Sequence, residues 1–311
     1  MSQPQNTFEQ IVQAIEKSTQ HLYPMWMMNT RENVNLAKDG DSLDKIFARP
    51  AVNRALIVGR GPSLLKYRHP QLLCEHPFPG VVVSSDGALP LLQERGIYPN
   101  FSVTVDGSPI IEKWYQNPAV MTEAIMPITA HPATVKAAME KGYHLYWFIP
   151  ELDSGETKRG ITEILQMMTL GAKNTTGISR LNGAGCSGLC SFVFAAIILR
   201  AKEIVLVGMD NGYPHDTPLP ELHYHHKILE SCGYDPNKAA SCYSIVYSKD
   251  WDQYCIVDPV FESYRRCFEG LAAAAKQMGI KIINCTEGGC LVADGVSCLP
   301  LEAYLSEAMG A

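Results

Sequence analysis

The chain has 311 residues, of which 46% are hydrophobic and 19% charged, a composition typical of a folded globular protein. Its 26 basic and 32 acidic residues give a net charge of −6, which argues against a protein held on nucleic acid by phosphate contacts. The longest apolar run, Phe192 to Leu199, is too short to span a bilayer, and the first ten residues lack the pattern of a secretory signal. We therefore expect a cytoplasmic protein that acts on small molecules and binds neither nucleic acid nor membranes.

The ten cysteines predict neither a disulfide framework nor a zinc site. No two of them form a Cys-x-x-Cys pair, although paired short spacings are typical of structural zinc sites. In a chain without a secretory signal we expect reduced thiols that pack as small apolar side chains.

The first fifty residues are predicted to form a helical extension. Apolar residues recur at helical spacing over residues 6–22, at Phe8, Ile11, Val12 and Ile15, which predicts an amphipathic helix. A methionine and tryptophan cluster and a polar stretch follow it. We expect residues 1–50 to pack on the main domain or on a second subunit, which would make the protein a homo-oligomer.

From residue 51 to residue 311, short apolar runs alternate with helical stretches. Strands are predicted at 55–58, 81–83, 101–105, 125–129, 145–149, 204–207 and 281–284. Helices are predicted between them at 63–74, 87–95, 132–141, 185–200 and 259–278. Strands that are apolar on both faces and alternate with helices imply a parallel sheet covered on both sides. Right-handed crossovers then predict a doubly wound, mostly parallel α/β fold of the Rossmann-like kind.

The loop after the first of these strands reads Gly59-Arg60-Gly61-Pro62-Ser63. Ligands of such sheets bind beyond the carboxyl ends of the strands. The glycines allow a sharp turn, the proline suits the first turn of a helix, and free N–H groups at a helix start attract anions. The loop is therefore either a nucleotide phosphate site or a tight turn without a ligand, and its spacing does not distinguish the two.

The next two strands both end in Asp-Gly, at Asp86-Gly87 and Asp106-Gly107. An aspartate at a strand end can hold a divalent metal or a ribose hydroxyl. The other interpretation is an Asx turn or a helix cap, which is the more common use of such a residue. For Asp86 the cap is at least as good an interpretation, whereas Asp106 is the better candidate for a functional role.

A Gly-x-Gly-x-x-Gly match covers Gly183, Gly185 and Gly188. The residues before it form a poor strand, so the match does not favour a dinucleotide site. We expect these glycines to open the next helix and to present backbone donors to a ligand.

A histidine-rich segment follows Asp210, which stands directly after the strand at 204–207. His223 and His225 would lie on one face of an extended segment and could bind a metal, or could be surface residues. A histidine here could also act as a general base near pH 7.

Taken together, these motifs resemble the MptE-like 6-hydroxymethylpterin diphosphokinase family. The resemblance spans roughly residues 52–300 and rests on Gly59-x-Gly61-Pro62-Ser63-Leu64, Asp86-Gly-Ala-Leu, Gly96-Ile97-x-Pro99, Val103-Thr-Val-Asp106, Gly183 to Ser187, Val207-Gly208-Met209-Asp210 and Asn284 to Gly289. Similar domains occur in flagellin-modifying glycosyltransferases, and the first loop is also similar to that of bacterial CMP-sialic-acid sialyltransferases. The resemblance implies that residues 51–311 form a nucleotide-dependent transferase domain.

The resemblance also implies roles for individual residues. Nucleotide contacts are expected from Gly59, Arg60, Gly61, Pro62, Ser63, Gly183, Gly185, Ser187, Thr286 and Glu287. Asp106 and Asp210 are expected to carry Mg²⁺ or to contact ribose, and either Asp86 or His223 is expected to take a proton from the acceptor. The leading hypothesis is transfer of a diphosphoryl group from ATP to a hydroxymethylpterin-like acceptor. The alternatives are glycosyl transfer from a CMP-sugar and a non-catalytic nucleotide-binding protein.

Overall fold

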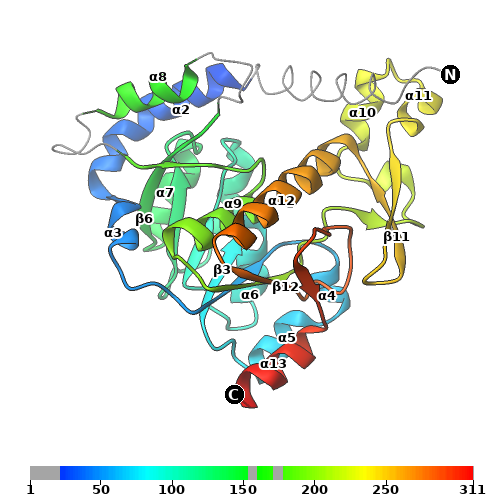
Figure 1. The fold of residues 1–311 in the computed structure, drawn as a ribbon. Helices are drawn as coiled ribbons and strands as arrows, with labels where there is room; N and C mark the ends of the chain where they lie inside the picture. The colour runs from blue at the N-terminus through cyan, green and yellow to red at the C-terminus, as the bar shows by residue number, and fades with distance from the viewer. Residues whose placement is uncertain (1–21, 153–159, 171–177, 311) are drawn as a thin grey trace.

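The computed structural model of the chain describes residues 22–152, 160–170 and 178–310, and a large parallel sheet lies at its centre (Figure 1). Within these residues the sheet has ten strands in the order β1-β6-β5-β4-β3-β2-β8-β12-β13, with β7 paired to β6. The strands are β1 Asp41–Ser42, β2 Arg54–Val58, β3 Val81–Ser85, β4 Phe101–Val103, β5 Glu123–Pro127, β6 His144–Pro150, β7 Arg180–Leu181, β8 Glu203–Val207, β12 Lys281–Asn284 and β13 Val296–Cys298. Neighbouring strands are parallel throughout this sheet, which confirms the predicted fold class.

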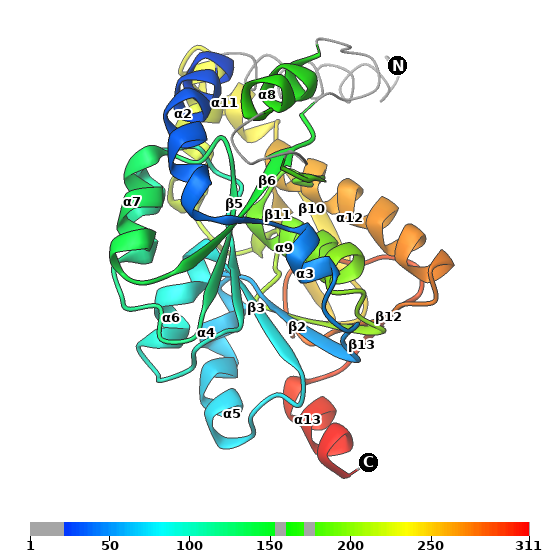
Figure 2. The same ribbon diagram turned by 90° about the vertical axis from the view of Figure 1, so that its left-hand side faces the viewer.

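Helices cover both faces of the sheet (Figure 2). The helices of the sheet are α3 Asp44–Phe47, α4 Ser63–Lys66, α5 His69–Glu75, α6 Leu89–Gln93, α7 Pro132–Glu140, α9 Ser187–Val193, α12 Pro259–Gln277 and α13 Leu301–Gly310. Strand β2 shows how the two faces are built, because Ala55 and Ile57 pack with α3, α9 and α12, while Leu56 and Val58 pack with α4, α5, α6 and α13. All four side chains are fully buried, as expected of a parallel strand that is covered on both sides.

Strand β2 is also where the winding of the sheet reverses. The strands β3, β4, β5 and β6 follow on one side of β2, and β8 and β12 follow on the other. The junction of β2 with β8 is therefore the topological switch point, where doubly wound sheets usually bind their ligands.

Two predicted helices are interrupted. The helix expected over 63–74 is broken into α4 and α5 at Arg68, which has a φ of 57° and precedes Pro70 in the first turn of α5. The helix expected over 185–200 starts as α9 and continues as a π-helical turn, Phe194–Ile198.

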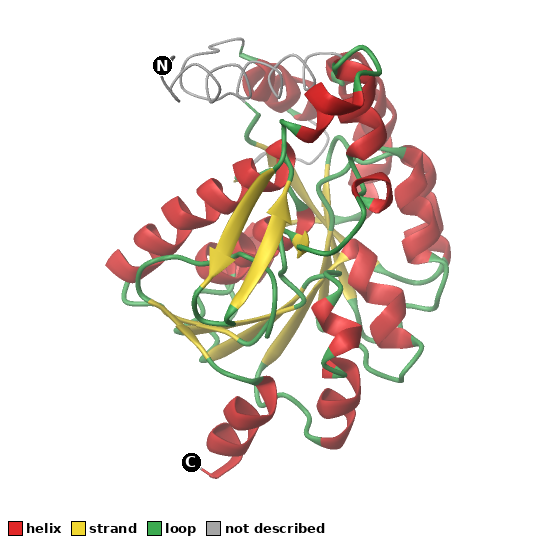
Figure 3. Cartoon of the chain, turned by 90° about the vertical axis from the view of Figure 1, so that its right-hand side faces the viewer, coloured by secondary structure: helices red, strands yellow, loops and turns green. Residues whose placement is uncertain are grey.

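A segment between β8 and α12 forms a second, smaller sheet that the sequence pattern does not predict. Its strands, β9 Tyr213–Pro214, β10 Ser244–Ser248 and β11 Gln253–Val257, pair antiparallel in the order β10-β11-β9. Two short helices, α10 His225–Ser231 and α11 Pro236–Ala240, lie between β9 and β10. We call residues 211–258 the insertion, and Figure 3 shows its strands in front of the parallel sheet.

The N-terminal region contributes a long helix, α2 Tyr23–Leu36, where the sequence analysis expected a polar stretch. The helix predicted over residues 6–22 lies outside the described residues. Helix α2 lies beside α8 Ile161–Thr169 (Figure 1). No helix of the described residues combines the length and the apolar character needed to span a bilayer.

Two buried asparagines attach α2 to the sheet. The Asn29 Nδ2 donates to the carbonyls of Gly107 and Thr129, at 3.0 and 2.9 Å. The Asn33 Nδ2 donates to the carbonyls of Ile128 and Ala130, at 2.9 and 2.6 Å. The helix is thus bonded to the backbone beyond β4 and β5, near Asp106.

We expect Asn29→Ala and Asn33→Ala each to lower the free energy of unfolding by about 1–3 kcal/mol, because each change leaves buried carbonyls without donors. Asn35→Ala, at an exposed position of the same helix, is the matched control and should change stability little. The measurement is urea unfolding of the three variants, and equal effects of all three would contradict this role for the buried pair.

Candidate functional site

The glycine-rich loop at the switch point is bonded to the loop that follows β8. The Gly59 N–H donates to the Val207 carbonyl at 2.8 Å, and the Gly61 N–H donates to the Gly208 carbonyl at 2.7 Å. The N–H groups that the sequence analysis assigned to a phosphate therefore already have acceptors within the protein.

The carboxylate of Asp210 completes this junction. Its Oδ1 accepts the Ser63 N–H at 3.2 Å, and its Oδ2 accepts the Ser63 hydroxyl at 2.6 Å. Asp210 is only 5% exposed, and burial raises the pKa of its carboxyl to about 6, although the bonds from Ser63 oppose that shift. We call this contact of Asp210 with Ser63 the clasp.

Two glycines leave room for the clasp. A Cβ atom at Gly61 would overlap the Asp210 carboxylate, and one at Gly289, whose φ is 72°, would overlap the Asp210 backbone. The pocket that remains beside Asp210, lined by Lys66, Gln253 and Gly288 among others, has a volume of about 20 Å³. That is room for a single water molecule and not for a nucleotide.

Thr286 and Glu287 lie behind the clasp and also contact protein groups. The Thr286 hydroxyl accepts the Met209 N–H at 3.2 Å. Glu287 Oε1 lies 3.0 Å from Nε2 of the buried His69 and accepts the Leu301 N–H at 3.1 Å, at the start of α13. Both residues hold loops together at the carboxyl ends of β8 and β12.

A second group of predicted residues surrounds Asp86. Its Oδ2 accepts the hydroxyls of Thr104 and Ser187, at 2.7 and 2.8 Å, and its Oδ1 accepts the Gly87 N–H at 2.6 Å. Burial raises the pKa of the Asp86 carboxyl, these bonds lower it, and the negative charge of Asp106 raises it further. Because its oxygens are engaged in joining the ends of β3, β4 and α9, the arrangement favours a positioning role for Asp86.

Asp106 is exposed, in contrast to Asp86 and Asp210. Its Oδ1 accepts the Ser108 N–H at 2.7 Å in an Asx turn, and its own N–H donates to the Thr104 hydroxyl at 3.4 Å. The loop that carries Asp106 is thus bonded to the Asp86 group and leaves the Asp106 carboxylate accessible from solvent.

Arg60 extends from the glycine-rich loop toward this second group. Its Cδ lies close to Gly87, where an added Cβ would come within 2.8 Å, and its guanidinium lies 4.1 Å from the ring centroid of Trp114. Within the described part of the chain no carboxylate forms an ion pair with it. Arg60 is exposed, so its charge is available to a ligand.

The loop over residues 183–187 lies beside Asp106. Ser187 joins it to the neighbouring strand, because its hydroxyl accepts the Val105 N–H at 3.3 Å in addition to bonding Asp86. Gly185 has a φ of 85°, and a Cβ there would come within 2.8 Å of the Tyr264 ring, so packing explains this glycine. At Gly183 an added Cβ would meet only Val105, at an ordinary 3.6 Å.

The insertion brings His223 to the same place. Partial burial and then the positive charges of Lys227, His226 and Arg60 lower the pKa of the His223 imidazole, while Asp258 raises it. His225, predicted to share a face with His223, instead begins α10, and its Nδ1 lies 2.9 Å from the Tyr243 hydroxyl. The two histidines therefore do not share one extended segment.

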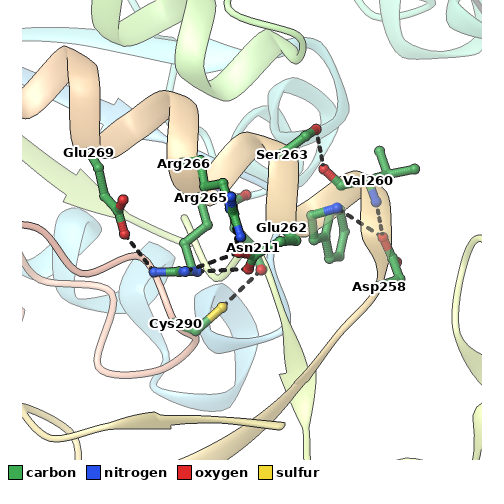
Figure 4. A network of polar contacts seen from close by, with 10 residues as sticks. Asn211, Asp258, Val260, Glu262, Ser263, Arg265, Arg266, Glu269 and Cys290 are labelled. Carbon is green, nitrogen blue, oxygen red and sulfur yellow. Dashed lines mark hydrogen bonds and ion pairs between the residues drawn. The ribbon is translucent and has the colours of Figure 1, made fainter. Parts of the chain in front are cut away.

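The insertion is fixed at both of its ends (Figure 4). At its end, the Asp258 carboxylate caps α12 by accepting the N–H groups of Val260 and Phe261, at 2.9 and 2.8 Å. At its start, the Cys290 thiol donates to the Asn211 carbonyl at 3.0 Å. These bonds hold the segment that carries His223 against the parallel sheet.

We define the Arg60 site as Arg60, Asp106, Ser187 and His223, with Asp86 beneath them. Four further residues contact members of this site or the loops that carry them, and the sequence analysis did not predict them. Thr104 could have been found, since it is a hydroxyl residue next to an apolar strand. No sequence pattern marks Trp114, Tyr224 or Tyr264, because their partners come from distant segments.

Asp106 and Asp210 follow strands that are not neighbours. They follow β4 and β8, which are separated in the sheet by β3 and β2, so their strands lie about 14 Å apart at the usual spacing. Both oxygens of Asp210 accept hydrogen bonds from Ser63, whereas Asp106 is exposed. Among the residues that the structure describes, no three His, Cys, Asp or Glu side chains are grouped so as to hold a metal ion.

Comparisons with known proteins agree with this architecture. A family model described as 6-hydroxymethylpterin diphosphokinase MptE-like matches residues 25–216, which is more than half of the chain and includes most of α2. Among solved structures, the chain is similar to the MAf glycosyltransferase from Magnetospirillum magneticum AMB-1, with a TM-score of 0.57 and 12% identity. The similarity covers 91% of this chain but only 41% of the MAf chain. Because so few residues are identical, it is a similarity of fold. No curated protein sequence matches.

The buried carboxyl of the clasp predicts a specific pH dependence. The pKa of Asp210 is about 6 in the folded protein and near 3.8 in the unfolded chain, so the folded state binds this proton more tightly. Asp210 should therefore stabilise the protein as the pH falls from 7.5 to 4.5, by about 2–3 kcal/mol.

Urea unfolding of the wild type and of Asp210→Asn across this range measures the effect. The difference between their free energies of unfolding should change with pH, whereas Asp216→Asn, at an exposed position of the insertion, should differ from the wild type by a constant amount. A pH-independent difference for Asp210→Asn would show that the buried carboxyl does not titrate in this way.

Asp86→Ala should lower the free energy of unfolding by about 1–3 kcal/mol, because the Thr104 and Ser187 hydroxyls lose their shared acceptor. Asp216→Ala serves as the control for loss of a surface carboxylate. If the two variants unfold at the same urea concentration, Asp86 does not join these loops.

Proposed function

Because the chain belongs to the MptE-like 6-hydroxymethylpterin diphosphokinase family, we propose that it is a nucleotide-dependent transferase that binds the phosphates of its donor at the Arg60 site. Family membership supports the transferase class. The leading reaction is transfer of a diphosphoryl group from ATP to the hydroxyl of a hydroxymethylpterin-like acceptor, which forms the diphosphate ester and AMP.

The observation that carries this proposal is the exposed guanidinium of Arg60. It lies 4.1 Å from the ring centroid of Trp114 and its side chain lies beside Gly87, and no carboxylate of the described residues forms an ion pair with it. An exposed cation without a protein counterion suits an anionic ligand. The clasp, by contrast, has its donors engaged and room for about one water molecule.

Phosphoryl transfer asks the protein for alignment and for neutralisation of charge. In this proposal Arg60 binds the phosphates of the group that is transferred, and the loop at Ser187 lies next to them. His223, kept neutral at pH 7 by its lowered pKa, accepts the proton of the acceptor hydroxyl. Asp86 keeps these loops in register.

Mg²⁺ is an expected companion of ATP and would neutralise part of its phosphate charge. Of the two carboxylates predicted to contact it, Asp106 is the exposed one, whereas both oxygens of Asp210 are bonded to Ser63. We therefore assign any contact with the cation of the donor to Asp106 rather than to the clasp.

Glycosyl transfer from a CMP-sugar is the second candidate. It is favoured by the separation of Asp106 from Asp210, because a donor with one phosphate needs no metal held between two carboxylates. The similarity of the fold to that of the MAf glycosyltransferase supports the same candidate. Binding of CMP in preference to ATP, with turnover that continues in EDTA, would select this reaction.

Arg60→Gln should raise the Kd for the nucleotide donor about tenfold or more, since a charge-assisted hydrogen bond contributes about 1.5–3 kcal/mol. Arg68→Gln, an exposed arginine at the start of α5, is the matched control and should bind as the wild type does. Calorimetric titration with ATP, GTP, CMP and CDP, each with and without Mg²⁺, measures both.

The same preparations are then assayed for AMP release with a hydroxymethyldihydropterin. Donor binding that Arg60→Gln leaves unchanged would place the phosphates elsewhere. Binding that depends on Arg60 without turnover of any acceptor would instead support a non-catalytic nucleotide-binding protein.

A further inference from the structure

Two cysteines of the insertion face each other. The Sγ atoms of Cys232 and Cys242 lie 3.8 Å apart, and both residues are half-buried, so they can be reached from solvent. Cys232 directly follows α10, and Cys242 follows α11. The chain between them is therefore a loop whose two ends meet at a pair of thiols.

The local backbone holds both cysteines in place without fixing their side chains. The Cys232 N–H donates to the Ile228 carbonyl and the Cys242 N–H donates to the Ala239 carbonyl, as in the last turns of short helices. The Cys242 thiol donates weakly to the Lys238 carbonyl at 3.4 Å. A disulfide has an S–S distance of about 2.05 Å, so the two sulfurs need to approach by less than about 2 Å.

We propose that Cys232 and Cys242 are a reversible dithiol–disulfide couple that ties α10 to the segment after α11. The oxidant is a small disulfide of the glutathione class. One of the two protein thiols gives up its proton, attacks one sulfur of that disulfide, forms a mixed disulfide and releases one small thiol. The other protein thiol then gives up its proton, its sulfur attacks the protein sulfur of the mixed disulfide, and the second small thiol leaves. Two protein thiols and one small disulfide thus give one protein disulfide and two small thiols.

The couple lies on the segment that follows His223 of the Arg60 site. His225 begins α10, and its Nδ1 lies 2.9 Å from the Tyr243 hydroxyl, next to Cys242. A disulfide would hold that contact in place two residues after His223. The effect of the disulfide on binding rests on the proposed function. If the donor binds at the Arg60 site, the oxidised protein binds it more tightly, since a preorganised site loses less freedom on binding.

Other cysteines provide internal comparisons. Cys255 and Cys290 are both buried, and the Cys290 thiol donates to the Asn211 carbonyl, so a small disulfide does not reach them readily. Cys74 is exposed, and its thiol donates to the Arg95 carbonyl at 3.4 Å. Cys74 therefore tests exposure without a facing thiol.

Tryptic digestion separates the pair cleanly. Cleavage after Lys227, Lys238 and Lys249 gives one peptide of residues 228–238, with Cys232, and one of residues 239–249, with Cys242. The full chain is incubated with oxidised glutathione, remaining thiols are alkylated, and the peptides are mapped by mass spectrometry with and without dithiothreitol. We expect these two peptides to be linked after oxidation and to separate on reduction.

Cys232→Ser should abolish the link, and Cys74→Ser should leave it unchanged. Absence of the link in the wild type, or its loss in Cys74→Ser, would overturn the couple. In the same samples, oxidation should lower the Kd for the donor about threefold. If the disulfide forms but the Kd does not change, the disulfide does not act on the Arg60 site. Peptide mapping does not depend on donor binding, so failure of the couple and failure of the proposed function give different results.

Discussion

The arrangement of the whole carboxyl edge depends on one buried carboxylate. Asp210 accepts both the N–H and the hydroxyl of Ser63, and so joins the loop after β8 to the loop after β2 at the point where the winding of the sheet reverses. A buried carboxylate with few donors is costly, and the raised pKa of Asp210 is the sign of that cost. The junction is stable because glycine backbones surround it closely and continue the hydrogen bonding of the two strands.

Because Asp210 and Ser63 bond each other at the switch point, the exposed polar side chains of this edge lie nearer the ends of β3 and β4. There Asp86 performs a comparable joining role, but the residues above it, Asp106 and Arg60, remain exposed. The insertion carries His223, and two polar junctions hold the ends of the insertion in place. The sheet thus supplies a rigid base, and the candidate site is assembled on it from loops that are remote in sequence.

The sequence predicted the central sheet well, because each strand is a short apolar run and parallel strands covered on both faces must be apolar throughout. The helix break at Arg68 was missed, since a left-handed residue before His69-Pro70 carries little periodic signal. The insertion was missed for a different reason: the apolar runs of β10 and β11 are short, form an antiparallel pair and fall outside the alternation of strands with helices on which the prediction rested. The roles of Ser63 and Asp86 could not be predicted either, because a hydroxyl or carboxylate at a strand end has the same sequence pattern whether it faces a ligand or another loop.

Helix α2 has a consequence for the way force passes through the molecule. The single amide group of Asn29 bonds the carbonyl of Gly107, next to Asp106, and that of Thr129, beyond β5. One side chain of α2 therefore joins two loops of the sheet, and one of these loops carries the exposed Asp106 carboxylate. A displacement of α2 would break these two bonds or move the Asp106 loop with the helix.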